Sequence, residues 1–168
     1  MYCHITKCLH RFKQLNMKIY TLHKKQNLPI SVDTCRAKVA QDALENDVEI
    51  INDVSGLKYD KNMPKTIEKF QPSLILCAYS KKIVNTRHVT ETKRLLQESI
   101  KTAKSVNISK NKIIVDPAIG FFRNSGTGFP FTKIKSNWAD RDITVLQNLS
   151  SIKNGFPLLV SVSNKSFI

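Results

Sequence analysis

The sequence predicts an α/β fold in which short parallel strands alternate with helices. Five apolar segments rich in β-branched residues recur along the chain, and helically spaced segments separate them. Such alternation gives parallel pairing through right-handed crossovers. Apolar strands of this kind are typical of a sheet covered on both faces. The pattern fits either a barrel or an open, doubly wound sheet.

The elements follow one another in a regular order. We expect strands at residues 30–32, 49–51, 74–77, 113–115 and 158–162, and helices at residues 36–46, 64–70, 86–106 and 140–153. The last helix has Ile143, Leu146, Leu149 and Ile152 at intervals of three residues, a helical spacing. Residues 117–138 show no regular period and are expected to be irregular.

The chain divides into a lead-in, residues 1–28, and a main domain, residues 29–168. The lead-in has no acidic residue, and apolar residues at helical spacing predict a basic amphipathic helix over residues 7–25. A length of 168 residues with 41% hydrophobic residues is sufficient for one folded domain. No apolar run approaches the ~20 residues that a membrane-spanning helix needs.

The cysteine content indicates a cellular compartment, whereas the net charge leaves several functions open. The four cysteines are scattered without a Cys-x-x-Cys pair, which favours a reducing cytoplasm over a disulfide-rich secreted protein. The net charge is +14, and 21 of the 27 cations are lysines. Solvated helix faces account for most of these lysines. Attraction of an anionic substrate and a nucleic-acid surface remain alternatives, although no specific nucleic-acid partner is expected.

Polar residues end four of the five predicted strands, and they are the candidate site. They are Asp33, Asn52, Asp116, and Ser163 with Lys165. Carboxyl ends of parallel strands meet at one edge, where barrels and open sheets hold their ligands. Carboxylates accept hydrogen bonds, Asn both donates and accepts, and Lys donates. The set therefore suits a flat, hydrogen-bonding ligand, and ordinary turn capping at each strand end is the alternative.

Four segments in order resemble the motifs of one enzyme family, dihydropteroate synthase. Its third, fourth, sixth and seventh strand motifs are similar to Ile30–Ala37, Ile50–Gly56, Ile114–Phe121 and Ser161–Ile168. The resemblance covers residues 29–168, and the segment Ala118–Gly120 is more similar to archaeal members. It implies an incomplete (β/α)8 TIM barrel of the pterin-binding type, containing strands three to seven.

The resemblance also implies roles for individual residues. Asp33, Asn52, Asp116 and Lys165 would line a pterin pocket, while Ser163 and Asn164 would border the arylamine. The family condenses hydroxymethyl-dihydropterin pyrophosphate with p-aminobenzoate and expels pyrophosphate. Asp33 would then be catalytic, since a carboxylate stabilises positive charge that develops on the pterin methylene.

The chain departs from the family in ways that limit these expectations. Asn164 stands where the family has Arg, so we expect an altered arylamine side or a modified arylamine. Mg²⁺ is expected with the family's pyrophosphate substrate, but its ligand lies on a strand that this chain lacks, and no residue here is assigned to a metal. We therefore expect weak or no synthase activity from the chain alone.

Other functions stay open at this point. A methyltetrahydrofolate-binding methyltransferase domain shares the barrel, and its Ser-Asn pattern matches Ser163 and Asn164. A non-catalytic pterin-binding or assembly module would act as a homodimer or with a complementing chain. The expected partners are small-molecule pterin and arylamine substrates, and no membrane partner is expected.

Overall fold

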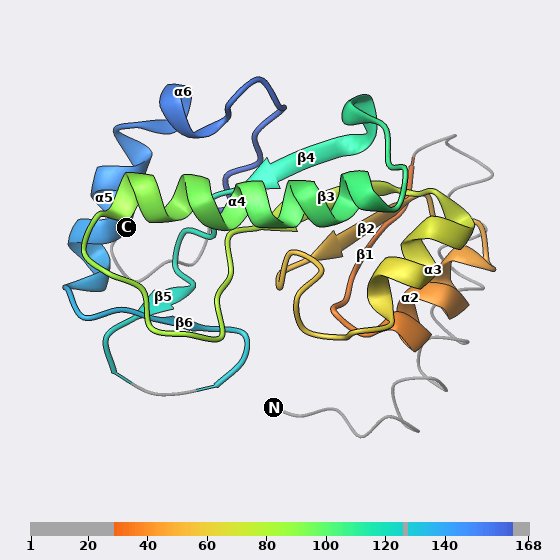
Figure 1. The fold of residues 1–168 in the computed structure, drawn as a ribbon, viewed down its shortest axis with the longest axis horizontal. Coiled ribbons are helices and arrows are strands. Elements are labelled where there is room, and N and C mark those ends of the chain that lie inside the picture. Colours follow the sequence, from red (N-terminus) through yellow and green to blue (C-terminus); the bar gives the residue numbers. More distant parts are fainter. Residues whose placement is uncertain (1–28, 126–127, 163–168) are drawn as a thin grey trace.

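The computed structural model describes residues 29–125 and 128–162 and shows one parallel sheet with helices packed against it (Figure 1). Its strands are β1 (Ser31–Asp33), β2 (Ile50–Asp53), β3 (Ser73–Cys77) and β4 (Ile113–Asp116). The helices are α2 (Ala37–Leu44), α3 (Met63–Phe70), α4 (His88–Ser105), α5 (Trp138–Leu146), α6 (Leu149–Ile152) and a 3-10 turn, η1 (Lys110–Lys112). The helix expected over residues 7–25 lies outside the described residues.

The strand order decides between the two predicted architectures. All neighbours are parallel, and the order β1-β2-β3-β4 follows the sequence without a reversal. A doubly wound sheet reverses its order at a switch point, whereas a barrel adds each strand beside the last. Leu158 continues the series, because it forms a parallel bridge to Val115 in β4. The described sheet is therefore part of a barrel wall.

Helices cover one face of this sheet. Ile51, Leu74, Leu76, Ile113 and Val115 point to that face and are fully or almost fully buried. The long helix α4 runs across it and contacts β3 and β4, and α5 packs against α4 (Figure 1). On the opposite face Ile75 and Ile114 are only partly buried. We call this second face, which would line a complete barrel, the inner face.

Two connections differ from the sequence-based expectation. Residues 117–138 contain a short parallel pair, β5 (Phe122–Arg123) and β6 (Thr132–Lys133), where no regular structure was expected. The helix expected over residues 140–153 is two helices, α5 and α6, separated at Gln147 and Asn148. The Asn148 side chain donates to the backbone carbonyl of Thr144 at 2.8 Å. Such local side-chain bonds compete with helix continuation.

The strand expected at residues 158–162 is reduced to the single bridge at Leu158. Leu158 and Val160 pack against the core, while Leu159 and Val162 are exposed. Leu158 and Val160 therefore lie on the packed side of this segment, and Leu159 lies on the exposed side. None of the helices in the described part of the chain is long and apolar enough to cross a membrane.

Gly56 lets the loop after β2 pass close to α4, and we predict that it cannot be replaced. Its φ is +59°, and an added Cβ would lie 2.2 Å from Ser99 Oγ and 2.6 Å from the Cys77 carbonyl oxygen. Gly56→Ala is expected to lower the free energy of unfolding by about 2–4 kcal/mol, through left-handed strain and overpacking. Urea denaturation measures this change.

Gly155→Ala is the matched control for this prediction. Gly155 also has a positive φ, +78°, but the nearest atom to an added Cβ is the flexible Lys110 Nζ at 3.4 Å. It should cost only about 1–2 kcal/mol. Equal losses in the two variants would show that close approach at Gly56 is unimportant.

Candidate functional site

The pairing of the strands brings three predicted site residues to the inner face. Asp33 is the registered partner of Asn52, and Asn52 is in turn registered with Ile75 in β3. One layer further along, Cys77 is registered with Asp116. Partners in a parallel sheet point to the same face, and so do residues two apart on one strand. Asp33, Asn52 and Asp116 therefore share the inner face at the carboxyl edge of the sheet.

Asp33 is the last residue of β1 and borders solvent. Its side chain is exposed, while the next residue, Thr34, donates its backbone N–H to the Asn52 carbonyl oxygen at 3.0 Å. Desolvation by the surrounding protein nevertheless raises the pKa of the Asp33 carboxyl above its ordinary value. Asp33 is thus accessible and held in a setting that disfavours its charge.

Asn52 has a polar atom that the described protein does not satisfy. Its side-chain Oδ1 is buried and accepts no hydrogen bond from any residue in the described ranges. Buried polar atoms in native proteins nearly always have a partner, and an exception calls for an explanation. A ligand N–H at the carboxyl edge is the simplest partner for this acceptor.

Asp116 is the most buried of the three residues. It is 7% exposed, and its Oδ1 accepts the backbone N–H of Ala118 at 2.7 Å. The neighbouring Cys77 thiol has a pKa well above its ordinary value because of burial first, and then the charges of Asp116, Asp53 and Asp33. Cys77 therefore remains a neutral thiol beside this carboxylate at neutral pH.

Asp53 belongs to the same sequence motif as Asn52 but lies on the other face. It is registered with Leu76 and is fully buried. Its carboxylate accepts from Ser55 N at 2.8 Å, Ser55 Oγ at 2.6 Å and Leu57 N at 3.0 Å. Burial raises the pKa of Asp53 in spite of these bonds. Asp53 shapes the loop that follows β2. Because consecutive strand residues point to opposite faces, the sequence could have placed Asp53 on the face opposite Asn52.

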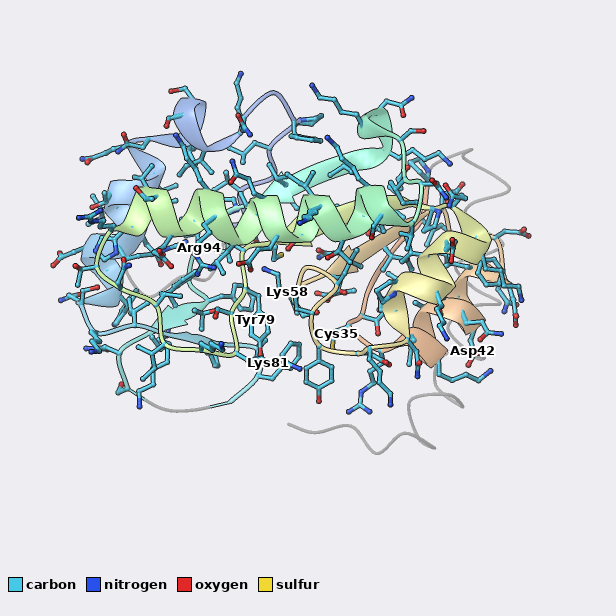
Figure 2. The ribbon with its side chains drawn as sticks, in the orientation of Figure 1. Cys35, Asp42, Lys58, Tyr79, Lys81 and Arg94 are labelled. Atoms are coloured by element: carbon cyan, nitrogen blue, oxygen red, sulfur yellow. The ribbon has the colours of Figure 1, made fainter. Side chains whose placement is uncertain are left out.

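Lys58 is a half-buried cation near the carboxyl edge that the sequence analysis did not single out. Its ammonium group donates to the backbone carbonyls of Tyr79 at 2.9 Å and Leu95 at 2.8 Å, and lies 3.3 Å from Glu98. Figure 2 shows Lys58 beneath α4 and beside Tyr79. Burial lowers the pKa of Lys58. This lysine joins the loops after β2 and β3 to α4, and no local sequence pattern marks it.

A basic hollow of about 500 Å³ adjoins the candidate site next to α2 and the loop after β2. Among its lining residues are Arg36, Lys38, Tyr59, Lys61 and Lys81. Arg36 follows Asp33 by three residues, so the hollow lies near the carboxyl edge. Four cations and one carboxylate, Asp60, line the hollow, and their net positive charge attracts anionic ligands to this side of the molecule.

The remaining predicted site residues, Ser163, Asn164 and Lys165, lie outside the described residues. In the described ranges, no group of three or more His, Cys, Asp or Glu side chains could hold a metal ion. The described His, Cys, Asp and Glu side chains therefore do not fit the Mg²⁺ that is expected for the family.

Comparison with known proteins identifies the family. The family model for pterin binding enzymes matches residues 9–168, which is nearly the whole chain. This chain belongs to the pterin-binding enzyme family. The match agrees with the shared face of Asp33, Asn52 and Asp116, and with the barrel order of the strands.

Two curated relatives of the chain are dihydropteroate synthases. The enzyme of Clostridium beijerinckii is 33% identical over 150 residues, which cover 84% of this chain and 48% of the relative. The enzyme of Synechocystis is 29% identical over 158 residues, covering 89% of this chain and 50% of the relative. The chain thus spans about half the length of the curated relatives that it matches.

Solved structures agree with the fold assignment. Dihydropteroate synthase from Clostridium difficile, crystallised in the presence of pteroic acid, matches with a TM-score of 0.80 and 31% identity, over 99% of this chain and 57% of that protein. The Coxiella burnetii enzyme in complex with pteroic acid gives a TM-score of 0.77 and 28% identity, over 96% and 58%. The partial barrel therefore has the fold of a dihydropteroate synthase.

Proposed function

We propose that this chain binds a pterin at the carboxyl edge of its sheet, as the pterin-binding part of a dihydropteroate synthase site. The observation that carries the proposal is the unpartnered Oδ1 of Asn52, which shares the inner face with Asp33 and Asp116. A pterin presents ring N–H and amino donors along one edge, and these three side chains supply acceptors. The relatives reported above favour a synthase over a methyltransferase.

The chemistry follows the family's condensation. The bond between the pterin methylene and the pyrophosphate oxygen breaks, and the arylamine nitrogen forms a new bond to that carbon and loses a proton. Asp33 lies at the accessible end of the site, where its carboxylate would stabilise positive charge on the methylene. By family resemblance, Lys165 donates to the pterin carbonyl, and Ser163 and Asn164 border the arylamine.

The basic hollow supports an anionic substrate. Arg36, Lys61 and Lys81 lie near the carboxyl edge, and their positive potential would speed the approach of a pyrophosphate ester. This attraction acts over about 10 Å at ordinary salt. The attraction would raise the rate at which the substrate meets the protein, and it does not place the bound pyrophosphate in the hollow.

Asn52→Leu tests the proposal through two opposite effects. Leucine of similar size removes a buried acceptor that has no partner among the described residues, so unliganded stability should rise by about 1 kcal/mol. The same change should weaken binding of 6-hydroxymethylpterin about tenfold, because the ligand donor loses its acceptor. Thermal unfolding and titration calorimetry measure the two effects.

Asn111→Leu is the control for this prediction. Asn111 is exposed in η1, at the opposite end of β4 from Asp116, so pterin affinity should not change. Unchanged affinity in Asn52→Leu, or absence of any pterin binding by the original chain, would contradict the proposal.

A second prediction uses the raised pKa of Asp33. Because burial raises this pKa above its ordinary value of 3.8, acidification should remove the carboxylate at a higher pH than in an exposed aspartate. The midpoint of the fall in pterin affinity on acidification should therefore lie above pH 3.8. The Asp33→Asn variant should lack this part of the fall, and coincident curves for the two proteins would exclude Asp33 from binding.

We further propose that complete turnover requires the remaining strands of the barrel, supplied by a complementing chain. The 168-residue polypeptide should bind a pterin yet form little or no pteroate from the pterin pyrophosphate and p-aminobenzoate. Adding a polypeptide with the remaining strands of a relative should raise pteroate formation. Robust turnover by the purified monomer, measured by chromatography of the product, would disprove this requirement.

A further inference from the structure

A buried ion pair on α5 lies outside the site residues considered above. Arg141 is 1% exposed and Asp142 is fully buried, and their side chains meet at 2.8 Å between Nη1 and Oδ1. Buried ion pairs are weak contributors to stability, because desolvation offsets much of their attraction. The buried position of Arg141 and Asp142 is therefore better explained by a role other than stabilising the fold.

The pair holds the backbone of the loop that directly follows Asp116. Arg141 Nη2 donates to the carbonyl of Pro117 at 2.7 Å, and Nη1 makes a longer bond to the carbonyl of Ala118 at 3.4 Å. Asp142 Oδ2 accepts the backbone N–H of Gly120 at 2.8 Å. Donors and acceptors of the pair thus fix both sides of one short loop.

This loop has a conformation that it would not adopt freely. Ala118 has a φ of +60°, which costs a non-glycine residue about 1–2 kcal/mol. In this conformation the Ala118 N–H reaches Asp116 Oδ1 at 2.7 Å and orients the carboxylate. Strained backbone persists at functional sites only where its surroundings determine it. Arg141 and Asp142 provide those surroundings.

The guanidinium group is itself held in place from two further sides. Arg141 Nη2 donates to Thr92 Oγ1 of α4 at 2.8 Å, and the group lies 3.6 Å from the centre of the Phe122 ring. Burial lowers the pKa of Arg141 to about 10, against the opposing effects of Asp142 and Asp116. The side chain therefore remains a cation at neutral pH and keeps its donors.

We propose that Arg141 and Asp142 are positioning residues, which hold residues 117–120 in the strained conformation that aims the Asp116 carboxylate at the ligand. This inference rests on the proposed pterin site for its function. The hold on the loop itself is independent of any ligand.

Arg141→Lys tests the inference while keeping the charge. An ammonium group cannot reproduce the planar set of bonds to Asp142, Pro117 and Thr92. We expect affinity for 6-hydroxymethylpterin to fall about tenfold, and the Ala118 and Gly120 amides to exchange hydrogen faster. Thr92→Val, which removes one acceptor of the guanidinium, should act in the same direction and serves if Arg141→Lys does not fold.

Rescue separates positioning from a general structural role. Ala118→Gly relieves the left-handed strain, so in the Arg141→Lys background it should restore affinity to within about threefold of the original chain. Arg94→Lys is the matched control, because the partly exposed Arg94 pairs with Glu91 and Glu98 within α4 itself. It should leave affinity unchanged.

The outcomes distinguish this inference from the proposed function. If Arg141→Lys keeps the pterin affinity and the amide exchange rates of the unsubstituted chain, the positioning role is overturned. It is also overturned if Arg141→Lys loses pterin affinity and Ala118→Gly does not restore it. If the original chain binds no pterin, the proposed function fails. Amide exchange at Ala118 and Gly120 then tests by itself whether Arg141 and Asp142 fix the loop, and unchanged exchange rates in Arg141→Lys would show that they do not.

Discussion

The in-register pairing of four parallel strands is the constraint on which the candidate site depends. It aligns Asp33 with Asn52 and Cys77 with Asp116, so that their side chains share one face. A slip of one residue would turn Asn52 into the helix-packed core and bring Asp53 to the inner face. The bonds of Asp53 to Ser55 and Leu57 fix the loop after β2, and these bonds therefore also secure the register.

The carboxyl edge combines groups that do not favour stability. Burial raises the pKa values of Asp33 and Asp53, the side-chain oxygen of Asn52 has no partner in the part of the chain that the structure describes, and Ala118 is strained. Stability comes from elsewhere, chiefly the apolar face between the sheet and α4. Raised pKa values, an unsatisfied acceptor and backbone strain are the features expected where a ligand, and not the protein, satisfies the polar groups.

Much of this arrangement could be predicted from the sequence, and the failures have physical reasons. Apolar runs and helical spacing located β1 to β4 and α2 to α4, and strand-end polarity located Asp33, Asn52 and Asp116. The two-residue strands β5 and β6 are too short to show a period. Arg141 and Asp142 resembled ordinary charges on a helix, because their burial depends on a loop more than twenty positions earlier in the chain.

A crystal structure of the chain with bound 6-hydroxymethylpterin tests the central claim most directly. The account predicts the pterin ring on the inner face, with a ring or amino nitrogen at hydrogen-bond distance from Asn52 Oδ1 and from a carboxylate oxygen of Asp116. A pterin bound elsewhere, with Asn52 Oδ1 still unpartnered, would contradict it.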